Sequence, residues 1–200
     1  RKGIEIEVLS ADNRDETRWP LFRGGWTDKC GRFSVDRLDP GNYIVVVHHY
    51  RAPHAGQPFA ESFYPGVATE KDAERVVVRE NSRVILGPLR LRPLALTKVR
   101  FQVRWSDGSK PKVSRLLLHN SRYPHQAVIS DVSIGVVDGI GELEAPSGFD
   151  YSVAAAVDCD GNKVIETRQS PTQMISIGKS DSPVEVTLTL PGLPCKLFFH

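Results

Sequence analysis

The sequence predicts an all-β protein built from two tandem antiparallel β-sandwiches. Short runs of alternating apolar and polar residues recur along the 200 residues, and clusters of Gly, Pro, Asn and Asp separate them. Helical periodicity of useful length does not occur in the sequence. The hydrophobic fraction of 40% is enough for ordinary apolar cores. We therefore expect short strands at regular spacing, as in a sandwich.

The first half is organised around residues 27–50, which predict a β-hairpin. Phe33 and Val35 alternate with polar residues, four turn-forming residues follow, and a β-branched and aromatic run begins at Tyr43. The same cadence returns at residues 138–157, so the chain is expected to carry this unit twice.

Other alternating runs predict the remaining strands. They lie at residues 4–8, 75–79, 84–91, 99–105, 113–118, 127–137, 174–177 and 184–190. The runs at 75–79 and 84–91 are close enough to form a second hairpin. Residues 10–25 and 51–66 are polar or rich in Pro and Gly and predict long loops, and residues 69–75 predict one or two helical turns.

Pro93 marks the expected domain boundary. It interrupts one strand pattern and the alternation then restarts in a new phase, which predicts domains at residues 1–95 and 96–200. In the second domain the strand at 99–105 precedes the segment that matches the start of the first domain. The first domain is therefore expected to lack its opening strand. An open edge on the strand at residues 4–9 would then favour self-association or pairing with another chain, or be covered by the loop that follows it.

The first predicted hairpin also carries a family resemblance. Its residues Thr27-Asp28, Gly31-Arg32-Phe33 and Leu38-x-Pro40-Gly41-x-Tyr43 resemble the signature of carboxypeptidase regulatory-like domains, which are prealbumin-like (transthyretin-like) β-sandwiches. In the second copy Asp138, Gly141, Leu143, Gly148 and Tyr151 match in kind, whereas Glu144-Ala-Pro146-Ser-Gly148 replaces the Leu-x-Pro-Gly core.

The resemblance implies two prealbumin-like, immunoglobulin-like sandwiches in tandem. It also implies an extracytoplasmic bacterial protein, secreted or in the cell envelope, in which such modules are non-catalytic accessory pieces. We therefore expect a structural or interaction module of a larger exported protein, with a protein or glycan partner.

Composition and motifs exclude several other classes. The 26 basic and 24 acidic residues are dispersed along the chain, which argues against a nucleic-acid or membrane-surface role. No apolar segment approaches the roughly 20 residues that span a bilayer. The sequence contains no nucleophile elbow, phosphate loop, zinc-protease helix or dinucleotide fingerprint, so we expect neither an enzyme nor a cofactor.

Aromatic residues in or beside the long loops of the first half provide the one candidate binding site. Trp19, Trp26, Tyr50 and Tyr64 would supply flat rings for a sugar, with His48 or His49 as hydrogen-bond partners. This predicts, as an alternative function, a carbohydrate-binding module. The other interpretation, which the length of the loops favours, is that the same rings anchor the loops to the sandwich.

The histidines and cysteines give weaker signals. His48 and His49 are adjacent, and adjacent strand residues point to opposite faces, so we expect no metal site there. Three cysteines are too few for a disulfide framework. If any pair is bridged, Cys159 with Cys195 is favoured because both lie in the second half, whereas Cys30 lies in the first. Three unbridged thiols remain the alternative.

Overall fold

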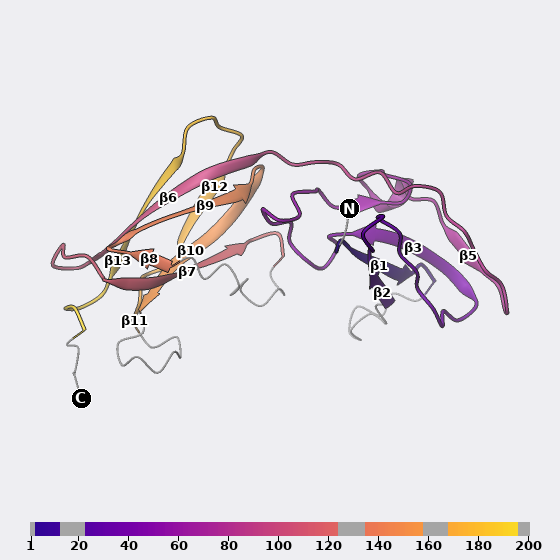
Figure 1. Ribbon diagram of the computed structural model, residues 1–200, viewed down its shortest axis with the longest axis horizontal. Coiled ribbons are helices and arrows are strands. Elements are labelled where there is room, and N and C mark those ends of the chain that lie inside the picture. The colour runs from indigo at the N-terminus through magenta and orange to yellow at the C-terminus, as the bar shows by residue number, and fades with distance from the viewer. Residues whose placement is uncertain (1–2, 13–22, 124–134, 158–167, 196–200) are drawn as a thin grey trace. The chain divides into compact units, whose positions relative to one another are not determined.

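The computed structural model describes residues 3–12, 23–123, 135–157 and 168–195. The chain divides into two compact units, Arg1–Leu94 and Ala95–His200 (Figure 1). Apart from the 3-10 turn η1 (Glu70–Asp72), all regular structure in the described ranges is β, so the predicted all-β class is confirmed. None of the described residues belongs to a helix long and apolar enough to cross a membrane.

The first unit is built on one antiparallel sheet. The strands that the structure describes in it are β1 (Glu5–Ser10), β2 (Arg23–Trp26), β3 (Gly41–Val47), β4 (Ser62–Phe63) and β5 (Val76–Val78). Their order is β2-β1-β3-β4, and β5 also pairs with β3. The apolar side chains of β1 alternate as predicted, and Ile4, Ile6 and Val8 lie buried in a core with Val45 and Val47 of β3.

The predicted hairpin at residues 27–50 is wrong in its first arm. β3 forms, but it pairs with β1 in the register Glu7↔Val46 and not with the residues that precede its turn. Among the described residues, 32–39 contribute to no strand. Phe33 and Val35 nevertheless pack against the first core. The alternation therefore predicted burial correctly and pairing wrongly, because periodicity carries no information about which partner a strand finds.

The predicted hairpin of 75–79 with 84–91 is also wrong. β5 pairs with β3 in the register Gly41↔Val78, and residues 84–91, all of which are described, form no strand. Leu86, Leu89 and Leu91 pack against the first core from this extended segment.

β1 does not have the open edge that the sequence predicts. On one side it pairs with β3, and on the other with β2 in the register Glu5↔Trp26. β2 begins inside the segment predicted as a loop, where an Arg-Gly-Gly-Trp sequence gives little sign of a strand. The edge of β1 is thus covered from within the same unit.

The second unit contains one long sheet that folds into two layers. The described strands are β6 (Leu96–Trp105), β7 (Val113–Asn120), β8 (Gly135–Val137), β9 (Ile140–Pro146), β10 (Phe149–Val157), β11 (Arg168–Gln169), β12 (Gln173–Ile177) and β13 (Val184–Leu190). They run in the order β11-β10-β7-β8-β9-β6-β13, with β12 beside β10. The apolar faces of β6, β9 and β13 meet those of β7, β10 and β12 in a single buried cluster, as in a sandwich.

One pair in this sheet departs from the antiparallel arrangement that the sequence predicts. β13 lies parallel to β6 over the whole of its length, from Val184↔Val99 to Leu190↔Trp105. Both strands alternate with the same period and bury Val99, Phe101, Val186 and Leu188 in the same core. Alternation has no direction, so it cannot distinguish a parallel from an antiparallel neighbour.

Tyr43 and Tyr151 have the same local geometry in the two units. Each is the third residue of its strand, and each hydroxyl donates a hydrogen bond back to a carbonyl of the preceding turn. The acceptors are the Asp39 carbonyl at 2.7 Å and the Pro146 carbonyl at 2.8 Å. This agrees with the predicted equivalence of the two tyrosines, while the repetition of the whole unit stays a prediction.

We expect Tyr151→Phe to destabilise the second unit more than Tyr43→Phe destabilises the first. The bond from Tyr151 is buried, so its loss leaves the Pro146 carbonyl without a donor and costs about 1–3 kcal/mol. The bond from Tyr43 is exposed, and water replaces it at a cost of about 0.5–1 kcal/mol. Urea unfolding of the two variants measures both costs. Equal losses of stability in the two variants, or a larger loss in Tyr43→Phe, would contradict the difference in burial between the two hydrogen bonds.

Candidate functional site

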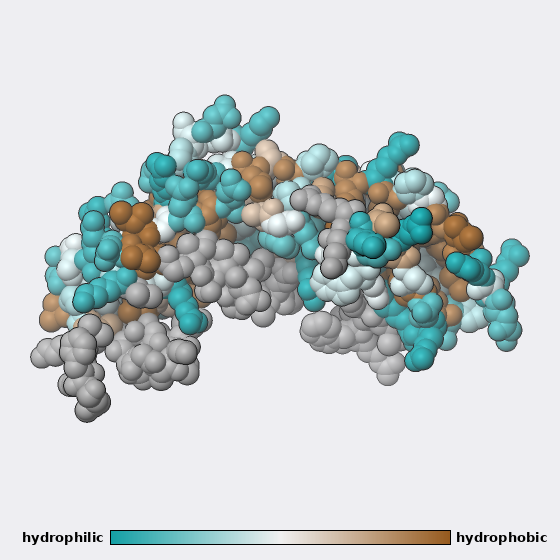
Figure 2. Space-filling view, in the orientation of Figure 1, coloured by the Kyte–Doolittle hydropathy of each residue, from teal (hydrophilic) through white to brown (hydrophobic). Residues whose placement is uncertain are grey.

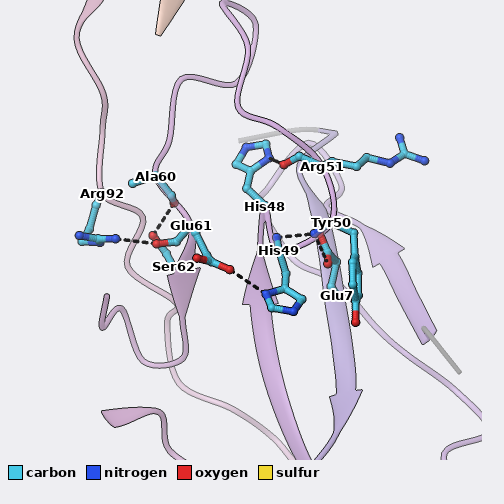
Figure 3. Close-up of polar contacts among 9 residues, drawn as sticks. All are labelled: Glu7, His48, His49, Tyr50, Arg51, Ala60, Glu61, Ser62 and Arg92. Carbon is cyan, nitrogen blue, oxygen red and sulfur yellow. Dashed lines mark hydrogen bonds and ion pairs between the residues drawn. The ribbon is translucent and has the colours of Figure 1, made fainter. Parts of the chain in front are cut away.

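Polar and titratable side chains of the first unit gather where the chain leaves β3. Residues 48–51 turn back across the end of β3, close to Glu7 of β1 and to Glu61 just before β4 (Figure 3). Glu5 of β1 lies beside Arg51 of the same turn. Because Glu5 and Glu7 alternate with Ile4, Ile6 and Val8, the two carboxyl groups lie on the face of β1 opposite the main core.

Glu7 is the buried centre of this group. Its side chain is 1% exposed, and its carboxyl oxygens accept hydrogen bonds from the backbone N–H groups of His49 and Tyr50, each at 3.2 Å. The residue before them, His48, has a φ of 59°, a left-handed conformation that bends the chain at this point. Burial raises the pKa of Glu7 to about 7, although the Tyr50 N–H favours the ionised form.

His48 stabilises the same turn through its side chain. Its ring is buried, and its Nδ1 lies 3.1 Å from the carbonyl oxygen of Arg51, to which the Nδ1–H of that tautomer donates. Burial lowers the pKa of His48 to about 4, so the imidazole is neutral at physiological pH. A buried, neutral ring that closes its own turn is not placed to receive a ligand.

His49 points the other way, toward β4. Its Nδ1 lies 2.7 Å from Glu61 Oε1, and its ring makes edge contacts with Tyr50 and Phe63 at centroid distances of 4.6 and 6.0 Å. Arg92 also fixes the backbone of Glu61, because its guanidinium donates to the Glu61 carbonyl oxygen at 2.6 Å. Figure 3 shows this chain of contacts running from Arg92 through Glu61 to His49.

Arg51 joins the turn to β1 and β2. Its Nε lies 2.8 Å from Glu5 Oε2, and its guanidinium carbon lies 5.6 Å from the centroid of the Trp26 ring, a cation-π distance. Glu5 and Trp26 are cross-strand partners, so the sheet register itself brings the carboxylate and the indole to one place. Burial raises the pKa of Glu5, and the charge of Arg51 opposes this shift.

The structure separates the six predicted ligand residues into different environments. Trp26 and Tyr50 are 56% and 44% exposed. The Arg51 guanidinium lies over the Trp26 ring, and the His49 ring contacts the Tyr50 ring. His48 is buried, and Tyr64 is buried in the first core, where its hydroxyl accepts the N–H of Gly87 at 3.1 Å. Trp19 lies outside the described residues. Of the predicted rings, Trp26 and Tyr50 are therefore the exposed ones within the described residues, with Arg51 over Trp26 and His49 beside Tyr50.

Sequence reasoning missed Glu5, Glu7, Arg51 and Glu61. The two glutamates of β1 looked like ordinary solvent-facing residues, and only the bend at His48 buries Glu7. A positive φ at a non-glycine residue leaves no clear mark in the sequence. Chemically, the group offers two exposed rings and an exposed guanidinium, whereas the carboxyl groups of Glu5, Glu7 and Glu61 are largely buried. Within the described ranges no cluster of three or more His, Cys, Asp or Glu side chains has the geometry to hold a metal ion.

The cysteines belong to other parts of the molecule. Cys30 is an exposed, free thiol. Cys195 is disulfide-bonded and packs against the second core. Its predicted partner Cys159 lies outside the described residues, so the pairing of Cys159 with Cys195 stays a prediction.

The opposite pKa shifts of Glu7 and His48 predict opposite pH dependences. Glu7 stays protonated in the folded state up to about pH 7, so its contribution to stability is present at low pH and is lost as the pH rises from about 4.5 to 7. His48 stays neutral in the folded state down to about pH 4, so its contribution is present at high pH and is lost as the pH falls from about 6.5 to 4.

Two variants separate these contributions. We expect Glu7→Gln to gain stability relative to wild type, by about 3 kcal/mol, as the pH is raised from 4 to 7.5, because only the wild type then loses the proton of Glu7. His48→Asn, which tolerates positive φ, should gain a similar amount relative to wild type as the pH is lowered over the same range. Denaturant unfolding of the first unit at several pH values checks both, and parallel pH profiles for all three proteins would refute the shifts.

Comparison with known proteins gives distant structural likenesses only. No protein-family model matches the chain, and no curated protein matches its sequence. The carboxypeptidase regulatory-like resemblance therefore remains a prediction from residues 27–43.

Three solved structures illustrate these likenesses. The TIE protein of Bacillus anthracis is 12% identical with a TM-score of 0.36, over 96% of this chain and 31% of that one. A shaft pilin of Lactobacillus rhamnosus GG is 10% identical with a TM-score of 0.33, over 95% and 93% of the two chains. A streptococcal ancillary pilin is 13% identical with a TM-score of 0.29, over 97% and 63%. All three TM-scores are below 0.5, and the chain spans 31% of the TIE protein.

Proposed function

We propose that this chain is a non-catalytic structural or interaction module of a larger exported bacterial protein, and that its second unit bears tension along the polypeptide. The export and the bacterial setting rest on the family resemblance of residues 27–43. The tension-bearing role rests on one observation, the parallel pairing of β6 with β13.

The direction of these two strands determines how force enters the unit. The chain enters the second unit through β6 at Leu96 and leaves β13 at Leu190, and the two strands are parallel and in register between these points. The entry and the exit therefore lie at opposite ends of the strand pair. Tension along the chain slides β6 against β13 and loads all of their hydrogen bonds together, instead of opening them one by one.

Contacts on both sides of β6 support this role. Its buried face contributes Val99, Phe101 and Val103 to the second core, each at most 1% exposed. On its outer face, Lys98 and Arg100 form ion pairs with Glu142 of β9 at 3.1 and 2.8 Å. β6 is thus held by the core and by β9 while β13 resists sliding. The exposed ion pairs themselves add little stability.

A single-molecule pulling experiment on the full chain tests the proposal. Handles at Lys98 and Pro191 would load β6 and β13 in shear, whereas handles at Lys98 and Asp181 would pull both strands from the same end. We expect the shear arrangement to require a several-fold higher unfolding force for the second unit. Because both arrangements use the same protein and share one attachment point, similar forces would refute the tension-bearing role.

The alternative function is carbohydrate binding by the first unit. The observation that favours it is the exposed pair Trp26 and Tyr50, with the Arg51 guanidinium over the Trp26 ring and the His49 ring against Tyr50. Flat apolar rings flanked by charged and hydrogen-bonding groups are what sugar recognition requires. In this alternative the exposed Arg51 guanidinium would bind sugar hydroxyls beside the indole.

A glycan array followed by calorimetric titration tests this alternative. We expect Trp26→Ala and Arg51→Ala to abolish any binding seen with the wild type. Ile85→Ser is the matched control, because Ile85 is an exposed apolar residue of the same unit outside this group. Absence of binding by the wild type, or loss of binding in the control as well, would refute carbohydrate binding at this site. The structural role would then be the remaining proposal.

A further inference from the structure

Two polar side chains are buried together where β6 begins. Thr97 is 1% exposed and occupies a core-facing position of β6, where the alternation would otherwise place an apolar residue. Ser147, in the turn between β9 and β10, is 7% exposed, and its hydroxyl oxygen lies 2.8 Å from that of Thr97. Hydrophilic residues, teal in Figure 2, cover much of the surface that it shows, so polar side chains inside the core are the exception.

These two side chains belong to one chain of hydrogen bonds. Each hydroxyl has a single proton to donate. Thr97 Oγ1 donates its proton to the Gly178 carbonyl at 2.8 Å, so Ser147 is the donor in the contact between the two hydroxyls. The Ala95 carbonyl, 3.1 Å from Ser147 Oγ, accepts the backbone N–H of Ser147 at 2.9 Å. Both hydroxyl protons and both carbonyls then have a partner. We call Ala95, Thr97, Ser147 and Gly178 the entry latch.

The entry latch connects three parts of the second unit. Its first two residues lie where the chain enters β6. Ser147 lies in the turn that joins β9 of one layer to β10 of the other, and Gly178 directly follows β12. The same turn is also tied to the end of β12, because the Gly148 N–H donates to the Ile177 carbonyl at 2.6 Å. The start of β6 is therefore connected to both layers of the sandwich.

Tension along the chain reaches the entry latch before it reaches the ladder between β6 and β13. Ala95 precedes β6, so a force from the preceding chain acts first on the bonds of Ala95 and Thr97. Their partners lie in the β9–β10 turn and after β12, and a sliding β6 would leave these partners behind. Because the hydroxyl groups are buried, water cannot replace their hydrogen bonds until β6 has moved.

We propose that the entry latch holds β6 in place under tension, so that the hydrogen bonds of Thr97 and Ser147 must break before β6 slides against β13. This inference rests on the proposed tension-bearing function and assigns part of the resistance to two hydroxyl groups. Both side chains are positioning residues, since they act through β6. Loss of either hydroxyl interrupts the connection from the turn to the end of β12.

Force-clamp measurements on the full chain test this role by changing where the force enters. A handle at Pro93, which is exposed and precedes the entry latch, loads the latch together with β6. A handle at Lys98 bypasses the latch, because the force then enters β6 after Thr97. The second handle is at Pro191, just after β13, in both arrangements. The measured quantity is the lifetime of the second unit at constant force.

We expect Thr97→Val to shorten this lifetime about tenfold with the handle at Pro93, because about one buried hydrogen bond is lost from the barrier to sliding. With the handle at Lys98 the same variant should shorten the lifetime much less. Thr97→Ser keeps the hydroxyl and should behave like the wild type. Adding Ser147→Ala to Thr97→Val should shorten the lifetime little further, because the two hydroxyls act in one chain of bonds.

Ser170→Ala is the matched control. Ser170 follows β11, is 4% exposed, and accepts the Ala155 N–H of β10 at 2.9 Å through its hydroxyl oxygen. This variant also loses a buried hydroxyl, but outside the path of force from β6 to β13. Urea unfolding should show a loss of stability similar to that of Thr97→Val, whereas the lifetime with the handle at Pro93 should change much less.

The results distinguish failure of the entry latch from failure of the tension-bearing role. An unchanged lifetime of Thr97→Val with the handle at Pro93, equal shortening with both handles, or equal shortening by Ser170→Ala would overturn the latch alone. The tension-bearing role fails separately, if the wild type resists shear no better than a pull on both strands from the same end. The latch would then carry no load and would be refuted with it.

Discussion

The constraint on which both units depend is that an extended segment becomes a strand only where a neighbour pairs its backbone. Apolar alternation brings a segment onto the core, but the hydrogen bonds that make a sheet need a second segment at about 4.8 Å. In the second unit β6 supplies that neighbour twice, to β9 and to β13. In the first unit the segments at 32–38 and 84–91 bury their apolar side chains without a ladder. The same kind of sequence therefore gives different secondary structure in the two units.

This constraint explains how far the fold could be predicted from the sequence. The all-β class, the strands β1, β3, β6 and β13 and the burial of their alternating residues follow directly from periodicity. Strand pairing does not follow from periodicity, because it depends on the rest of the sheet. β3 pairs with β1 and β5 and not with the residues before its turn, and β13 pairs with β6 in parallel. β2 was missed because its two glycines give no apolar pattern.

The candidate site shows a similar division between residue types and geometry. Trp26, His49 and Tyr50 were found from the sequence because aromatic residues and histidines in loops are conspicuous. Tyr64 and His48 have the same chemistry but are buried, one in the core and one within its turn. The groups that organise the site, Glu7 above all, depend on a left-handed residue and a sheet register, neither of which is visible in the residue types alone.

The buried pair Glu7 and His48 also determines how folding of the first unit exchanges protons with the solvent. Between about pH 4.5 and 6.5 the unfolded chain carries a proton on His48 and none on Glu7, whereas the folded unit carries one on Glu7 and none on His48. Both states hold the same number of protons on these two residues. Folding is therefore equivalent to moving a proton from the His48 imidazole to the Glu7 carboxyl group, and for this pair the stability of the folded state does not change with pH across this range.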